Sequence, residues 1–289
     1  MVTRIFGKSR LLIAWGGFGL SLPHHEICDR RNYFPLRLKA TDLDDDRLPD
    51  GTRYNLSDFA REYLQSLDAS PDDLFYHTLA VLHSPIYRTQ NAGALRQDWP
   101  RVPLPSTKNA LEQSAALGRQ VAALLDPEQS VPGITMTPLT RSFATLATMA
   151  ATDGGTLSPD SGDLELTAGW GHGTGVVMPG KGKSIGREYD ATERQAFTDD
   201  EWTLLGNKTY DIYLNDRAYW KNIPDNVWSY TLGGYTVLKK WLSYREKSIL
   251  QRGLTLEEAR YVSTVVRRIA ALLLLTPELD THYEQVGTP

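Results

Sequence analysis

The sequence predicts an α+β protein with a helical N-terminal block, a central strand-rich lobe and C-terminal helices. Three observations support this class. Helix-start signals cluster before residue 126, the chain from 154 to about 208 is rich in Gly, Thr and Ser with short alternating runs, and helix signals return after residue 235. We therefore expect two domains, residues 1–130 and 131–289.

The first 26 residues resemble a secretory signal, because basic residues precede an apolar stretch at 11–22. Glycines and Trp15 interrupt that stretch, and no small-x-small cleavage site follows, so a buried strand or hairpin is the better interpretation. No apolar run approaches the roughly 18–20 residues of a membrane helix. We expect a cytoplasmic protein with no membrane partner. Residues 42–50 are acidic and predict a solvated loop.

The helical block follows. Ser70 before Pro71 and two aspartates gives an N-cap, a proline at the first helical position and acids in the first turn, and this helix must end before Pro85. Ser84-Pro85 repeats the signal for a short helix toward Asp98. Three prolines make 99–105 an extended connector, and Ser106 opens a third helix through Leu125.

The central lobe contains one clear strand. Residues 208–214 alternate, with Tyr210, Ile212 and Leu214 on one side, which predicts a half-buried strand. Thr198-x-x-Glu201 is a capping box for a short helix.

The C-terminal helices carry their own signals. Gly233-Gly234 precedes a predicted helix over 235–247. A second capping box, Thr255-x-x-Glu258, begins a long helix to Leu275 that Pro277 stops.

Most catalytic chemistry has no signature in this sequence. The single cysteine excludes a disulfide framework and a multi-cysteine zinc site. The sequence contains no phosphate-binding GxxxxGK[ST] loop, no NPPY-like motif of amino-methyltransferases and no GxSxG elbow, and the alternating glycines at 169–175 do not match GxGxxG. Neither Pro-Asp pair has the later Glu-x-Lys of metal-dependent nucleases. We predict no catalytic residue and no metal ligand; His77 and His83 lie six residues apart, do not converge on one helix face, and are expected to be structural.

The strongest binding feature is a basic run near the C-terminus. Five cations stand against Glu246 alone, a local excess of four positive charges in a chain of net charge −4; they are Lys239, Lys240, Arg245, Lys247 and Arg252. If 235–247 is one helix, Lys240, Tyr244 and Lys247 share a face while Trp241 lies on the apolar stripe. A basic face with an aromatic ring suits a phosphate backbone, but a solvated lysine face would look the same.

A second basic segment spans Met178–Arg187. Glycines separate Lys181, Lys183 and Arg187, and glycine lets a backbone approach a partner closely. The segment could follow DNA phosphates or form a flexible surface hairpin.

The run 227–245, VWSYTLGGYTVLKKWLSYR, resembles the C-terminal specificity region of type ISP restriction-modification enzymes and related single-chain adenine DNA methyltransferases. Residues 74–88, 98–103 and 33–36 fit segments of the same family, so the resemblance covers about 27–283. It implies a target-recognition module joined through its first helices to a catalytic body. A nuclease, a RecA-like translocase and a methyltransferase that uses S-adenosylmethionine precede this region in the family, and none of their motifs occurs here.

The resemblance and the basic segments together predict that the chain binds double-stranded DNA for a methyltransferase or nuclease portion in the same or a neighbouring chain. It would hold no cofactor itself, with S-adenosylmethionine in the catalytic domain. Gly233 and Gly234 would shape the turn before the helix that Trp241 anchors. The candidate DNA-binding residues are Lys239, Lys240, Tyr244, Arg245, Lys247, Lys181, Lys183 and Arg187.

Two alternatives remain open. The chain could be a protein-interaction module whose two amphipathic terminal helices dock a partner subunit. It could also be a hydrolase built around His24, His25 and Glu26, although adjacent residues on a strand point apart.

Overall fold

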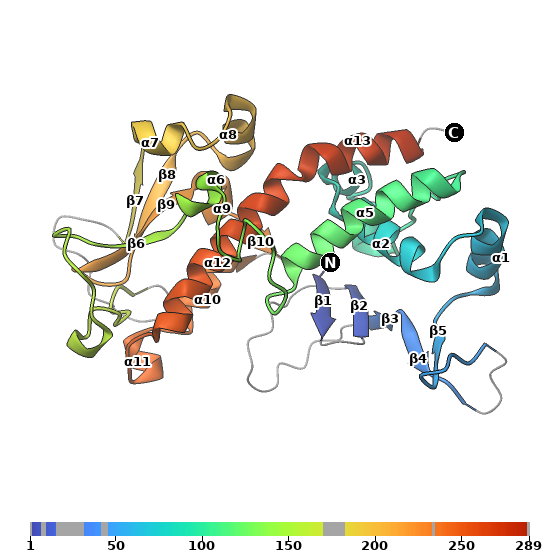
Figure 1. The fold of residues 1–289 in the computed structure, drawn as a ribbon, viewed down its shortest axis with the longest axis horizontal. Helices are drawn as coiled ribbons and strands as arrows, with labels where there is room; N and C mark the ends of the chain where they lie inside the picture. The colour runs from blue at the N-terminus through green and yellow to red at the C-terminus, as the bar shows by residue number, and fades with distance from the viewer. Residues whose placement is uncertain are drawn as a thin grey trace. The chain divides into compact units, whose positions relative to one another are not determined.

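The computed structural model describes residues 2–6, 10–15, 32–41, 46–169, 183–232 and 235–287, with side chains of the first two ranges and of 32–34 left aside. The described chain is α+β, as predicted, and combines helices with antiparallel sheets (Figure 1). It divides into two compact units. The first contains 1–129 together with 275–289, and the second contains 130–274. The last helix therefore groups with the first unit, whereas the sequence had placed it in the second domain.

The first unit is built on helices. They are α1 (Asp58–Leu67), α2 (Pro71–His83), α3 (Pro85–Gln90), α4 (Ala94–Gln97), α5 (Lys108–Leu125) and α13 (Thr276–Gly287). Helices α2 and α5 form the central pair, and α13 packs against α2, α3 and α5. Leu79 and Leu111, one from each helix of the central pair, are fully buried.

Short antiparallel strands complete the first unit. Strands β1 (Val2–Phe6), β2 (Arg10–Trp15) and β3 (Asn32–Pro35) pair in that order, so the predicted N-terminal hairpin is present. Strand β4 (Arg37–Lys39) pairs with β5 (Thr52–Tyr54).

The extended connector between α4 and α5 is held through alternate carbonyl oxygens. Tyr87 donates to the Arg101 oxygen at 3.1 Å, His77 Nε2 contacts the Pro103 oxygen at 2.8 Å, and Tyr63 donates to the Pro105 oxygen at 2.8 Å. An extended chain exposes every second carbonyl to one side, which allows three side chains to bind it in a row.

The second unit is centred on a four-stranded antiparallel sheet in the order β6-β9-β8-β7. The strands are β6 (Thr148–Ala151), β7 (Ser184–Arg187), β8 (Thr209–Tyr213) and β9 (Ala218–Pro224). The predicted strand is present as β8, but it is not half-buried: four of its five residues are buried, so both of its faces are covered.

Helices surround this sheet. Besides the 3₁₀ helix Pro159–Ser161, they are α6 (Arg141–Ala144), α7 (Ala191–Arg194), α8 (Asp199–Leu205), α9 (Asp225–Trp228), α10 (Val237–Ser243), α11 (Lys247–Leu250) and α12 (Leu256–Leu274). Helix α12 packs on β9, α8 and α9, and the small strands β10 (Thr231–Leu232) and β11 (Tyr235–Thr236) pair before α10.

The helix starts follow the predicted caps more closely than the helix ends do. Ser70 and Ser84 cap α2 and α3, and both predicted capping boxes are present, at Thr198 and at Thr255. The third helix begins at Lys108 with Thr107 as its cap, and the segment 85–97 forms two helices instead of one. Pro277 does not close the helical region, because it is near the start of α13.

None of the helices in the described part of the chain combines the length and apolar character needed to cross a bilayer.

Candidate nucleic-acid interface

Helix α10 supports the basic run. Its inner face buries Val237, Leu238, Trp241 and Leu242. The Trp241 ring stacks on Tyr261 of α12 with ring centroids 5.9 Å apart. Trp241 therefore packs in the core, and the opposite side of this short helix carries the two adjacent lysines.

The single helix predicted over 235–247 is wrong. Helix α10 ends at Ser243 with Tyr244 as its C-cap, and Glu246 has an extended backbone. The Lys247 N–H donates to the Leu166 carbonyl at 2.8 Å, which ties Lys247 to another segment and starts α11. Lys240, Tyr244 and Lys247 consequently do not form one helical face.

Lys239 and Lys240 instead lie over aromatic rings. Lys239 Nζ is 5.4 Å from the ring centroid of Trp228. Lys240 Nζ is 4.9 Å from the ring of Tyr235 and 4.5 Å from that of Tyr244. Tyr235 and Tyr244 are 50 % and 41 % exposed, so the two rings that flank Lys240 are open to solvent.

Sequence reasoning missed a third lysine beside these rings. Lys208 Nζ lies 5.3 Å from the Tyr210 ring, whose centroid is 6.4 Å from that of Trp228. Only the fold brings residues 208–210 next to 228, and a lysine before a strand carries no signal of its own. We call this set the lysine–aromatic strip: Lys208, Tyr210, Trp228, Tyr235, Lys239, Lys240 and Tyr244.

Arg245 is turned inward, and the structure does not support its predicted contact with phosphate. Its guanidinium lies 4.1 Å from the Trp241 ring centroid, Nε is 3.8 Å from Glu258 Oε1, and the side chain is only 17 % exposed. Burial lowers the pKa of Arg245, an effect that Glu258 opposes. A phosphate would have to displace packed neighbours to reach it.

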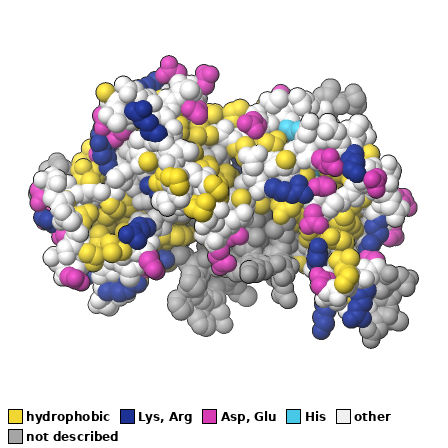
Figure 2. Space-filling view, viewed as in Figure 1, with side chains coloured by type: hydrophobic (Ala, Val, Ile, Leu, Met, Phe, Trp, Pro, Cys, Tyr) yellow, Lys and Arg dark blue, Asp and Glu magenta, His cyan; other side chains and the backbone are white. Residues whose placement is uncertain are grey.

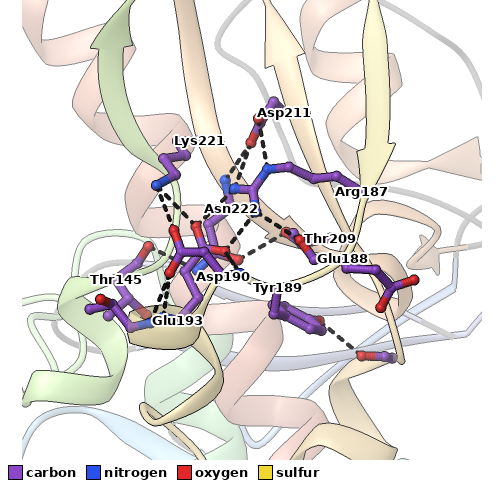
Figure 3. Close-up of polar contacts among 12 residues, drawn as sticks. Thr145, Arg187, Glu188, Tyr189, Asp190, Glu193, Thr209, Asp211, Lys221 and Asn222 are labelled. Atoms are coloured by element: carbon purple, nitrogen blue, oxygen red, sulfur yellow. Dashed lines mark hydrogen bonds and ion pairs between the residues drawn. The ribbon is translucent and has the colours of Figure 1, made fainter. Parts of the chain in front are cut away.

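Arg187 is committed to the sheet rather than to a surface loop. Its Nε and Nη2 contact both oxygens of Asp211 at 2.9 and 3.0 Å, while Nη1 and Nη2 contact both oxygens of Glu193 at 2.7 and 2.8 Å (Figure 3). Hydrogen bonds to Glu193 are the main reason that the pKa of Arg187 is raised. With its hydrogen-bond donors occupied, Arg187 has no group left for DNA, and the structure does not support its predicted contact with phosphate.

The same network orders the neighbouring segments. Lys221 Nζ pairs with Asp190 at 2.9 Å and with Glu193 at 3.4 Å. The Asn222 N–H donates to Asp211 at 3.0 Å (Figure 3). The backbone of Asn222 has a φ of 63°, which is unusual outside glycine. The cluster joins β7, β8, β9 and α7 and has a structural role.

Two other cations of the basic run are paired at the surface. Lys247 Nζ is 2.7 Å from Glu165 Oε2, and Arg252 makes a two-pronged contact with Glu258 at 2.6 and 3.0 Å. The side chains of Lys247 and Arg252 are both 48 % exposed.

The contacts described above do not test the predicted roles of several other residues. Lys181, Gly233 and Gly234 lie outside the described residues, as do His24, His25 and Glu26. Lys183 is half-buried just before β7, and its carbonyl accepts a hydrogen bond from the Tyr213 N–H at 2.8 Å.

Within the described ranges, no group of three His, Cys, Asp or Glu side chains is placed to hold a metal ion. His77 is fully buried, with Nδ1 2.7 Å from Ser114 Oγ and Nε2 2.8 Å from the Pro103 oxygen, and burial lowers its pKa to about 4. It packs α2 against α5 and the connector, which is a structural role.

Residues 20–265 match a family model described as the type ISP C-terminal specificity domain. A search of curated proteins gives no match. Several solved structures, including the following three, are similar to this chain at low identity. The cryo-EM DrdV–DNA complex is 19 % identical with a TM-score of 0.47, covering 90 % of this chain and 22 % of that one.

The second is a nuclease-deletion mutant of the type ISP restriction-modification enzyme LlaGI in complex with a DNA substrate mimic, 16 % identical with a TM-score of 0.41, covering 87 % of this chain and 18 % of that one. The third is the ATP-dependent type ISP restriction-modification enzyme LlaBIII bound to DNA, 14 % identical with a TM-score of 0.44, covering 86 % of this chain and 13 % of that one. The chain thus spans less than a quarter of the length of each.

Proposed function

The chain belongs to the family of type ISP C-terminal specificity domains, and we propose that it binds duplex DNA through the lysine–aromatic strip of its second unit. Its function is DNA target recognition in a restriction-modification enzyme. The proposal concerns which surface performs that function.

The observation that carries the proposal is what surrounds the ammonium groups of Lys239 and Lys240. Among the residues that the structure describes, no carboxylate pairs with either ammonium group, and both lie over aromatic rings. A cation over a ring face keeps its full charge, so it can still neutralise a phosphate and release counterions. The exposed rings of Tyr235 and Tyr244 offer flat surfaces to a sugar or a base edge.

Within this proposal the lysines position the duplex, and they carry no sequence information themselves. Base edges would be contacted by polar side chains near the strip, and the chain would make and break no bonds. A methyltransferase or nuclease portion, in the same or a neighbouring chain in the cytoplasm, would supply the chemistry. S-adenosylmethionine would bind there, where an adenine flipped out of the duplex is methylated at N6.

The alternative of a protein-interaction module is not favoured by the terminal helices. The apolar residues of α10 are buried, and the apolar face of α12 is buried against β9, α8 and α9. The amphipathic faces on which that alternative depended are covered by the chain's own residues.

The test is the salt dependence of binding to a labelled duplex, measured by fluorescence anisotropy. With about four phosphates neutralised, log K falls against log salt with a slope near −4. The double variant Lys239→Gln/Lys240→Gln should weaken binding to all sequences and flatten the slope by about 2, since each phosphate contributes about 0.9.

Arg101→Gln provides a control for the loss of one exposed charge. This side chain is 90 % exposed and is not part of the strip, so its replacement should leave the slope unchanged. A wild-type slope near zero, or equal effects of the strip variant and the control, would contradict the proposal.

A further inference from the structure

Two carboxylates from outside the basic run neutralise part of it. In sequence the run has an excess of four positive charges, but Glu165 and Glu258 contact Lys247 and Arg252, which reduces that excess to two. On the face drawn in Figure 2, Lys and Arg side chains lie interspersed with Asp and Glu side chains.

The backbone holds Glu165 next to Lys247. Leu164 and Leu166 are both buried, so the side chain between them points outward. The Leu166 carbonyl accepts from the Lys247 N–H at 2.8 Å, and the Leu164 carbonyl accepts from the Leu254 N–H at 2.9 Å. The carboxylate therefore sits beside the ammonium group because both segments are fixed on either side of the contact.

Glu258 is fixed in a different way. It is the acidic member of the capping box of α12, where its Oε2 accepts from the Thr255 N–H at 2.9 Å. Both of its oxygens also accept from Arg252, and this hydrogen bonding is the main cause of the lowered pKa of Glu258. The helix start thus presents a carboxylate to a cation of the basic run.

These two pairs can exchange partners, unlike the Arg187 cluster. A carboxylate and a phosphate offer the same kind of acceptor oxygens to Lys and Arg. Surface pairs with half-exposed cations contribute only about 0–1 kcal/mol, so replacing the carboxylate by a phosphate costs little. Arg187 is held by two largely buried carboxylates, and breaking such pairs is expensive.

We propose that Glu165 and Glu258 lower the overall affinity for DNA by competing with its phosphates for Lys247 and Arg252. The proposal rests on the function proposed above. Each carboxylate weakens the phosphate contact to any sequence by the same free energy, so random DNA is bound poorly. A target sequence, which adds base contacts, is still held.

A double-mutant cycle on Glu165 and Lys247 tests this with the full chain and a labelled duplex of mixed sequence. Glu165→Gln should bind two- to fivefold more tightly at about 50 mM salt, with a slope steeper by up to about 1, because Lys247 is released. Lys247→Gln should bind more weakly. The double variant should match Lys247→Gln, since no cation remains to be released.

Glu258→Gln extends the test, because glutamine keeps the capping hydrogen bond while removing the charge. Its neighbour Glu257 is exposed on the same helix, so Glu257→Gln is a control with the same charge change. Glu258→Gln should increase affinity more than the control. Thermal melting of each variant verifies that it is folded.

The proposal is overturned if Glu165→Gln leaves affinity unchanged, if its gain persists without Lys247, or if Glu257→Gln gives the same gain as Glu258→Gln. Binding that responds to the Lys239/Lys240 variant but not to Glu165→Gln refutes this inference alone. If the Lys239→Gln/Lys240→Gln variant binds the duplex as tightly as the wild type, the proposed function is refuted, and this inference with it.

Discussion

Lys239 and Arg187 both belong to basic segments of the sequence, but their surroundings give them different roles. Lys239 is exposed and lies over the Trp228 ring without a carboxylate partner among the described residues. Arg187 is held by Glu193 and Asp211, whose side chains are 5 % and 13 % exposed. A guanidinium that pairs with two buried carboxylates stabilises the sheet, and it could bind a ligand only if those costly-to-break pairs were broken.

His77 gives the first unit a dependence on pH that can be measured. The Pro103 oxygen can only accept, so Nε2 carries the proton and Nδ1 accepts from Ser114 in the neutral ring. The folded pKa is about 4 against an ordinary value of 6.5, so the unfolded chain binds more protons between these values. Stability is therefore complete above about pH 6.5 and decreases as the pH falls toward 4.

We predict that His77→Gln changes this dependence. The wild-type contribution lost between pH 6.5 and 4 is about 3 kcal/mol, and the variant has no imidazole there to titrate. Urea unfolding at several pH values measures it: the stability difference between the two proteins should shrink on acidification. A difference that stays constant with pH would show that His77 is not the titrating group.

At the scale of elements, local signals located the helix starts and tertiary contacts decided the rest. Ser70, Ser84, Thr198 and Thr255 could be identified because a cap acts within three residues of itself. The end of α10 could not be identified, because Tyr244 and Arg245 fit a helix. The interruption comes from the Leu166 carbonyl, which binds the Lys247 N–H from about eighty residues earlier in the sequence. The predicted half-exposure of strand β8 is wrong for the same reason, because the residues that cover its second face come from other parts of the chain.

The close approach of α2 and α5 was also invisible in the sequence. Gly118 lies in the interior of α5, where a glycine has no local advantage. A Cβ at this position would lie 1.9 Å from the Tyr76 carbonyl oxygen of α2. The two helices can pack this closely only because that position has no side chain.

Gly118→Ala should therefore destabilise the first unit by about 3 kcal/mol or more, because the clash is with backbone and a helix must shift. Gly93→Ala is the matched control, since Gly93 has a helical φ and nothing within 4 Å of its Cβ position. That change should be neutral or slightly stabilising. Urea unfolding followed by circular dichroism compares the two, and equal stabilities would refute the packing argument.

At the scale of the whole molecule, the sequence supported the α+β class and the family, but it did not define the binding surface. The charges of residues that are close along the chain can be added directly from the sequence, and this sum identifies the basic run. Glu165, Glu258 and Lys208 join or neutralise that surface only after folding. A charge count over a sequence window therefore overestimates the field that DNA meets.

The division between recognition and chemistry leads to the last prediction. The sequence lacks an NPPY-like motif and a phosphate-binding loop. The purified chain, incubated with radiolabelled S-adenosylmethionine and a duplex that it binds, should transfer no label to the DNA. An active adenine methyltransferase in a parallel reaction shows that the assay works. Label transferred by the chain alone, above that of a heat-denatured sample, would place catalytic residues within it.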